Sequence, residues 1–122
     1  MGRETAHMDG ARAEAVVARF LQEQGYQIVA TNLRLGHLEI DVVARSGGTI
    51  AVVEVRTRGP GAWTSAFGSI NRTKRLRVRR AGERLWQRRY RHDPSVVHLR
   101  FDAAAVSFDG DEPRVEYVMA AF

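Results

Sequence analysis

One stretch decides the fold of this chain, and it reads Glu39-Ile40-Asp41-Val42-Val43-Ala44-Arg45, Ser46-Gly47-Gly48, Thr49-Ile50-Ala51-Val52-Val53-Glu54-Val55-Arg56-Thr57-Arg58. Two runs rich in β-branched residues flank a Ser-Gly-Gly turn, which is typical of a β-hairpin. If Arg45 pairs with Ile50, one face carries Glu39, Asp41, Val43, Val52, Glu54 and Arg56, because side chains alternate between faces. The predicted core face carries Ile40, Val42, Ala44, Ala51, Val53 and Val55.

This register sets two carboxylates, Asp41 and Glu54, directly opposite each other. Their Cβ atoms would lie about 4.5 to 5.5 Å apart, where the repulsion at an effective dielectric near 20 is roughly 3 kcal/mol. A raised pKa, the neighbouring Arg56 or a bound divalent cation can offset this cost. In the alternative, a one-residue slip separates the two acids and leaves both in water. The hairpin therefore indicates either a polar site or two solvated surface acids.

Positive charge is concentrated in one segment. The chain of 122 residues has a formal net charge of +5, but residues 72–91 alone hold ten basic residues and the single acid Glu83. The rest of the chain is therefore mildly acidic. A local basic surface is typical of a nucleic-acid-binding protein. The predicted nucleic-acid contacts are Arg58, Arg72, Lys74, Arg75, Arg79 and Arg80.

The remaining chain supplies the elements of a single α/β domain over residues 10–122, after a flexible segment at residues 1–9. Helices are predicted from Asp9 or Gly10 to Gly25 and from Ser69 to Tyr90. Besides the hairpin, strands are predicted over Tyr26–Thr31, Val96–Phe108 and Arg114–Met119. The turn-rich connection after Arg58 contains Gly59-Pro60-Gly61, Trp63 and Phe67-Gly68. The order α-β-β-β-α-β-β fits a mixed central sheet with helices on its faces.

Composition excludes several classes of function. The chain has no Cys, which rules out disulfides, thiolate zinc sites and a cysteine nucleophile. Its four His residues lack metal-ligand spacing, and it has neither a phosphate-binding Gly motif nor a nucleophile elbow. No apolar run approaches the ~18 residues of a membrane span, and the first residues lack a signal-peptide core. We expect a cytoplasmic protein without a membrane partner.

The acid pair also carries a resemblance to a known family. Asp41 followed by Glu54-Val55-Arg56 resembles the Asp…(Asp/Glu)-x-Lys signature of restriction-endonuclease-like nucleases. The ordered motifs are similar to the YraN family, which is related in fold to archaeal Holliday-junction resolvases: Glu39-Ile40-Asp41, Glu54-Val55-Arg56-x-Arg58, Phe67-Gly68, Lys74, Arg100-Phe101-Asp102 and Ala121-Phe122. The similarity runs from about Gly10 onward. It implies a restriction-endonuclease-like core and a metal-dependent nuclease.

The resemblance further implies the residues of the site. Asp41, Glu54 and the Val55 carbonyl would hold Mg²⁺ or Mn²⁺. Arg56 would contact the attacking water or the phosphate. The predicted catalytic set is Asp41, Glu54, Arg56, Glu14 and Lys74. Glu14 matches the family's acid on the first helix, with a surface ion pair as the alternative, and Lys74 lies on the side of the second helix predicted to face the hairpin.

The chain departs from the family at two positions, with Leu38 in place of the usual Gly and Arg56 in place of the usual Lys. Because Arg stays protonated, it can orient groups and stabilise charge but cannot act as a base. Two hypotheses remain open. The first is a metal-dependent nuclease acting on DNA, with branched DNA among its substrates. The second is a nucleic-acid-binding module with weak or lost catalysis. Both take DNA as the partner in preference to RNA, and both allow a homodimer.

Overall fold

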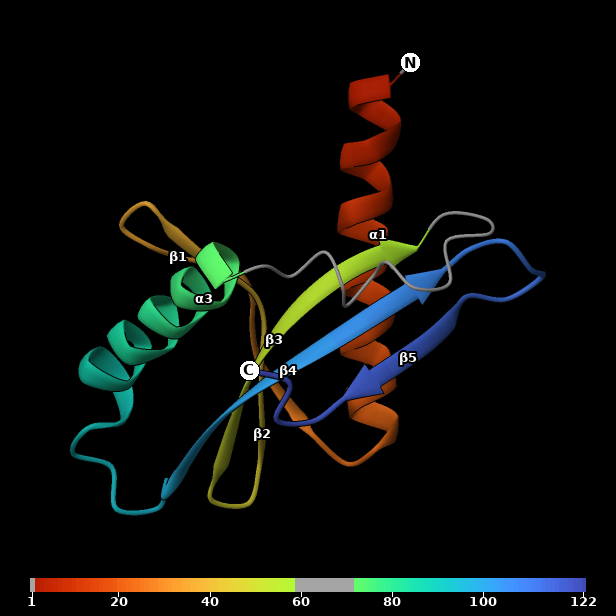
Figure 1. Cartoon of the computed structure of the whole chain (residues 1–122). Helices are drawn as coiled ribbons and strands as arrows, with labels where there is room; N and C mark the ends of the chain where they lie inside the picture. The colour runs from red at the N-terminus through yellow and green to blue at the C-terminus, as the bar shows by residue number, and fades with distance from the viewer. Residues whose placement is uncertain (1, 59–71) are drawn as a thin grey trace.

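A mixed β-sheet separates two helical layers in the computed structural model, which describes residues 2–58 and 72–122 (Figure 1). The strands are β1 (Gln27–Leu35), β2 (Leu38–Ser46), β3 (Thr49–Arg58), β4 (His98–Ser107) and β5 (Arg114–Val118). The helices are α1 (Gly2–Glu23), α3 (Arg72–Leu85) and the π-helical segment η1 (Trp86–Tyr90). The sheet order is β1-β2-β3-β4-β5, with only β3 and β4 parallel. The predicted α/β class, restriction-endonuclease-like core and element order are confirmed.

The β2–β3 hairpin has the predicted register. Arg45 pairs with Ile50, as expected. Gly47 in the turn has a φ of 57°, in the left-handed region that glycine adopts without steric cost. The ladder ends at the pair Val42–Val53, one residue before the two acids. The hairpin therefore holds the acids at its open end, away from the turn.

Both faces of the hairpin are buried, whereas the sequence predicted a single core face. Val43 and Val52 are fully buried in the core beneath α3. Val42 and Val53 are also fully buried, but they pack with Leu21 of α1 in a second core on the opposite face. The reason is the parallel pairing of β3 with β4, which requires a crossover connection, and its helix α3 covers the second face.

The prediction that Ile40 lies on the same face of the hairpin as Val42 was wrong. This side chain packs with Leu38 in the core beneath α3, whereas Val42 packs beneath α1. The alternation breaks at Asp41, which lies opposite Asn32, a residue whose φ of 50° is in the left-handed region. A left-handed residue in the partner strand interrupts the regular period of two, so the apolar pattern alone places Ile40 on the wrong side.

Several element boundaries differ from the expected ones. Helix α1 begins at Gly2, because Gly10 in a helix interior costs only about 1 kcal/mol and does not end the helix. Strand β1 extends to Leu35, because Gly36, with a φ of 69°, closes a tight turn into β2. The second helix changes to π-helical geometry after Leu85, and its predicted residues 69–71 lie outside the described residues. No helix in the described ranges is long and apolar enough to cross a membrane.

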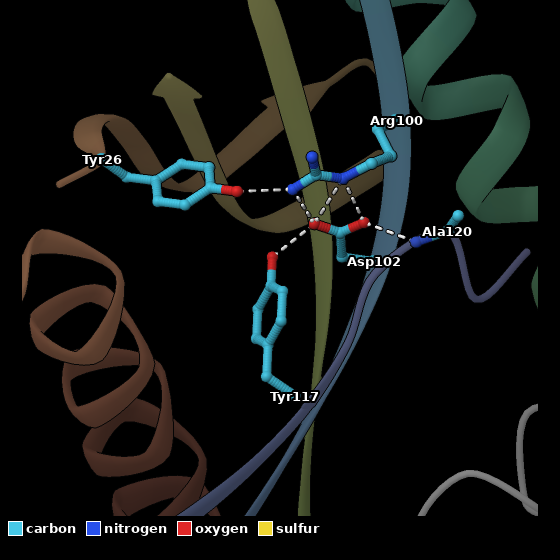
Figure 2. A network of polar contacts seen from close by, with 5 residues as sticks. All are labelled: Tyr26, Arg100, Asp102, Tyr117 and Ala120. Carbon is cyan, nitrogen blue, oxygen red and sulfur yellow. Dashed lines mark hydrogen bonds and ion pairs between the residues drawn. The ribbon is translucent and has the colours of Figure 1, made fainter. Parts of the chain in front are cut away.

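A buried carboxylate fastens β4 to the segments around it (Figure 2). Asp102 is fully buried and accepts hydrogen bonds from Arg100 Nε at 2.8 Å, from the Ala120 N–H at 2.9 Å and from the Tyr117 hydroxyl. Arg100 Nη2 also donates to the Tyr26 hydroxyl at 2.7 Å. The hydrogen bond to Asp102 raises the pKa of Arg100, and burial raises the pKa of Tyr117. Asp102 and Arg100 thus form a partly buried ion pair within β4.

We expect Asp102→Asn to lower the free energy of unfolding by about 3 kcal/mol. The change removes the charge that compensates Arg100 and sets an amide donor among groups that already donate. Urea denaturation measures the effect, with Asp111→Asn, an exposed acid, as the matched control. Equal stability of the two variants would show that this network does not stabilise the fold.

Candidate functional site

The site begins where the hairpin ladder ends. Beyond the pair Val42–Val53, the Val55 N–H donates to Asp41 Oδ2 at 2.8 Å. The Asp41 carboxylate thus takes the place of a backbone acceptor. Because the N–H and C=O of one strand residue point to the same side of the strand, the Val55 carbonyl also faces β2. The end of the ladder therefore brings a carboxylate and a backbone carbonyl to the same place.

Glu54 lies between two cations. Its side chain is 10% exposed, and its Oε1 lies 3.5 Å from Arg56 Nη2 and 3.6 Å from Lys74 Nζ. Arg56 follows two residues later on the same face of β3. Lys74 extends from the first turn of α3, and its predicted orientation toward the hairpin is confirmed. The structure thus brings Asp41, Glu54, Arg56 and Lys74 together from three elements.

Burial controls the protonation of the two carboxyl groups. Burial first and the Asp41 carboxylate second raise the pKa of Glu54 to about 7, although Arg56 and Lys74 oppose the increase. Burial also raises the pKa of Asp41, against the hydrogen bond from Val55. The two carboxyl groups are hydrogen-bonded to each other. Glu54 is therefore partly protonated near neutral pH when no cation is bound.

Arg56 has a donor that the described residues do not use. Its Nε is buried and has no hydrogen-bond partner among them, although its Nη2 lies beside Glu54. Leaving a buried donor unsatisfied costs about 1–3 kcal/mol. An oxygen of a phosphate or of a water molecule would remove this cost. The electrostatics of Arg56 therefore favour an anionic or polar ligand next to the acid pair.

The oxygen donors of the site are the two carboxyl groups and the Val55 carbonyl. Glu14 lies on α1, which covers the opposite face of the sheet from α3, and its Oε2 is buried. Within residues 2–58 and 72–122, no three side chains of His, Cys, Asp and Glu group closely enough to hold a metal ion. The participation of Glu14 in the site therefore stays a prediction.

The predicted nucleic-acid contacts lie mainly on α3. The exposed ones are Arg72, Arg75, Arg79 and Arg80. The Arg79 guanidinium lies 5.3 Å from the centre of the Phe101 ring, a cation–π contact that orients it along the β4 side of the helix. The Arg58 side chain and the predicted loop residues Gly59-Pro60-Gly61, Trp63, Phe67 and Gly68 lie outside the described residues, as does Ile70.

Sequence reading missed a contact at the rim of the site. Arg84 Nη1 donates to the Leu35 carbonyl at 3.0 Å, which ties the β1–β2 turn to α3. At Gly36 in this turn, where φ is 69°, a Cβ would lie 3.0 Å from Arg84 Nη1. Glycine therefore suits both the backbone conformation and the close approach. The available signal was the pattern Leu35-Gly36-His37-Leu38, a two-residue turn between apolar residues.

Fold and site together define an α/β protein with a restriction-endonuclease-like core, in which a buried carboxyl pair lies beside a basic helix. The chain belongs to the uncharacterised protein family UPF0102, whose sequence profile matches residues 13–106. It is 54% identical to a UPF0102 protein of Sorangium cellulosum, over 93% of this chain and 79% of the relative. It is 34% identical to the UPF0102 protein YraN of Salmonella arizonae, over 97% of this chain and 86% of the relative. The resemblance to the YraN family is confirmed.

The raised pKa of Glu54 makes the stability of the cation-free protein depend on pH. A carboxyl group with a pKa of about 7 when folded and 4.5 when unfolded binds its proton more tightly in the folded state. Its contribution to stability is complete below pH 4.5 and is lost as the pH rises through 7, by on the order of 3 kcal/mol. Glu54→Gln, which is always neutral, should therefore be more stable than the native protein at pH 8 and similar to it near pH 4.5.

Urea unfolding in EDTA at these two pH values measures the difference, with Glu83→Gln, an exposed acid on α3, as the control. A stability difference between Glu54→Gln and the native protein that does not change with pH would contradict the raised pKa of Glu54.

The hydrogen bond from the Val55 N–H to Asp41 predicts different stability losses for two substitutions of Asp41. Asp41→Ala removes the acceptor and should lower the free energy of unfolding by about 1–3 kcal/mol, whereas Asp41→Asn keeps an oxygen in place and should lower it far less. Thermal unfolding in EDTA compares them. Equal losses would mean that this hydrogen bond does not stabilise the fold. Asp41→Asn is therefore the better variant for removing the charge without disturbing the strand.

Proposed function

We propose that this protein binds nucleic acid and hydrolyses phosphodiester bonds of DNA with the help of a divalent cation. The observation that carries the proposal is the buried Asp41–Glu54 pair, set beside Arg56 and Lys74 at the end of the hairpin ladder. Two carboxyl groups held together away from water repel each other and lose hydration, which disfavours the folded state. Such an arrangement next to a basic helix supports phosphodiester chemistry.

The donor set fits Mg²⁺ or Mn²⁺. Both are hard cations that bind one or two carboxylates, backbone carbonyls and water. Asp41, Glu54 and the Val55 carbonyl would hold the cation, and Glu54 would release its proton as it binds the cation. The cation supplies positive charge that stabilises the reacting phosphate and activates water. The proposed role of Asp41 and Glu54 is therefore to position the cation next to the reacting phosphate.

Arg56 and Lys74 have different proposed roles. Arg56 is always protonated, so it orients the phosphate or the attacking water and stabilises negative charge. Its buried Nε is the donor available for this contact. Lys74, whose Nζ lies 3.6 Å from Glu54, is the basic side chain of the site that can in principle lose a proton. The base function that Arg56 lacks is thus assigned to Lys74 or to activated water.

The exposed arginines of α3 would supply most of the affinity. Residues 72–91 carry ten basic side chains against one acid, and contacts between such residues and phosphates depend on salt but not on base sequence. Because Lys74 belongs to the same helix, a strand held along α3 passes close to the acid pair. Helix α3 would then provide both the arginines that bind the strand and a residue of the reacting site.

A second function, a nucleic-acid-binding module with weak or lost catalysis, is favoured by one observation. Arg56 stands where the nuclease signature has Lys, and an arginine cannot accept a proton. Its Nη2 also lies 3.5 Å from the Glu54 oxygen that would bind a cation. The retained pair of acids favours the nuclease, and Arg56 favours the module.

A cleavage panel separates the two functions. Junction, flap, single-stranded and duplex DNA are incubated with Mg²⁺ or Mn²⁺ and either native protein or Asp41→Asn. We expect the native protein to cleave at least one substrate and the variant to be slower by about 10² or more. Equal cleavage by both would point to a contaminant. Salt-dependent binding without cleavage by the native protein would overturn the nuclease and support the module.

Arg56→Lys tests the contact between this residue and the reacting groups. The change exchanges a planar five-donor fork for a compact ammonium while keeping the charge. DNA affinity should change by no more than about twofold, because the phosphate attraction depends chiefly on charge. The cleavage rate should change by about tenfold or more. It would rise if the native site lacks a proton acceptor and fall if the fork positions the phosphate. Unchanged cleavage would show that Arg56 does not act on the reacting groups.

A further inference from the structure

A basic groove lies beside the site, between the β1–β2 turn and the outer side of α3. Its volume is about 430 Å³, and its walls are His37, Leu38, Thr73, Leu76, Arg77 and Arg80. His37 and Leu38 come from the turn and the start of β2, and the other four come from residues 73–80 of α3. The groove therefore combines two guanidinium groups, an imidazole and a hydroxyl with two apolar side chains.

One hydrogen bond joins the two elements that form the groove. The hydrogen bond from Arg84 Nη1 to the Leu35 carbonyl ties the turn to α3 one helical turn beyond Arg80. A Cβ at Gly36 would lie 3.0 Å from the same guanidinium, so a larger residue there would crowd this contact. Arg84 is occupied by the turn, and this leaves Arg77 and Arg80 as the cations that line the groove. Two elements far apart in sequence thus form a defined concave surface.

The positive charge of the groove is not neutralised by the described part of the protein. Neither Arg77 nor Arg80 makes a hydrogen bond or an ion pair with the described residues. They are three residues apart on a helix, so their side chains are neighbours that repel each other. Both are exposed. An anion between them would reverse this repulsion, and guanidinium groups bind phosphate oxygens in paired hydrogen bonds.

Both walls of the groove lead toward the acid pair. Leu38 begins β2, and Asp41 follows three residues later, about 10 Å along the strand. Thr73 immediately precedes Lys74, whose Nζ lies 3.6 Å from Glu54. A nucleic-acid strand with one phosphate at the acid pair would therefore reach the groove with a phosphate only a few nucleotides away.

We propose that this groove is a phosphate subsite for the bound nucleic-acid strand, and the inference rests on the proposed function. Arg77 and Arg80 bind the oxygens of one backbone phosphate, and Thr73 and His37 donate to it from the two walls. Leu76, which is 48% exposed, contacts the adjoining sugar. The apolar wall and a volume larger than one phosphate needs favour a phosphodiester within a strand over a free anion. The subsite fixes which bond of the strand reaches the acid pair.

Salt-dependent DNA binding tests the subsite. The variant Arg77→Gln with Arg80→Gln is compared with Arg12→Gln with Arg19→Gln, which removes the same charge from exposed positions on α1, across the sheet from α3. Losing the contact with this one phosphate should make the slope of log K against log salt shallower by about 0.7 to 0.9. The control pair should leave it nearly unchanged. Thermal unfolding checks that both variants fold.

A single neutral phosphate gives the second readout. Oligonucleotides carrying one methylphosphonate at successive positions should show one position that weakens binding of the native protein and not of the Arg77/Arg80 variant. If the native protein binds with a normal salt slope but the two double variants behave alike, and no such position exists, the subsite is overturned while the proposed function stands. If the native protein does not bind DNA in a salt-dependent way, the proposed function fails and the subsite fails with it.

Discussion

The conflict between the Asp41 and Glu54 carboxyl groups is the constraint on which the rest of this structure depends. Both groups leave water where the β2–β3 ladder stops, and each needs compensation at that point. The Val55 N–H supplies it for Asp41, and Arg56 and Lys74 supply it for Glu54. These groups come from β3 and α3, so the register of the hairpin, the length of β3 and the position of α3 are all tied to one pair of acids. A buried pair without such partners would strongly destabilise the fold.

The two faces of the sheet differ in how many charged groups they bury. The core beneath α1 is built from small and branched apolar residues such as Val17, Val42 and Val53, and its polar edge is the satisfied network around Asp102. The face beneath α3 has an apolar part around Val52 and Leu85 and a polar part around Glu54. The first face can therefore be packed for stability alone. The second must keep charged groups close together, which is the usual cost of a functional site.

Much of this arrangement follows from the sequence, and particular residues explain the rest. The Ser-Gly-Gly turn and the β-branched runs predict the hairpin and its register, and helical spacing places Lys74 above it. The break at Asp41 could not be predicted, because it depends on the left-handed backbone of Asn32 in a neighbouring strand. The burial of Val43 and Val52 follows from a parallel pairing that no local pattern reveals. The tie between Arg84 and Leu35 joins residues 49 positions apart, beyond any periodicity argument.

The parallel pairing of β3 with β4 also has a consequence for how the chain folds. The hairpins β1–β2 and β2–β3 join residues close in sequence, whereas Thr49 of β3 pairs with His98 of β4, 49 residues later. Contacts between distant residues form slowly because the intervening loop must first be closed. We therefore expect the hairpin acids to come together early, while water still screens their repulsion to below ~1 kcal/mol. Docking of α3 and β4 would then bury the two acids and bring Lys74 beside Glu54 in the same late step. The helix whose docking strengthens the repulsion between the acids thus also supplies a cation that offsets it.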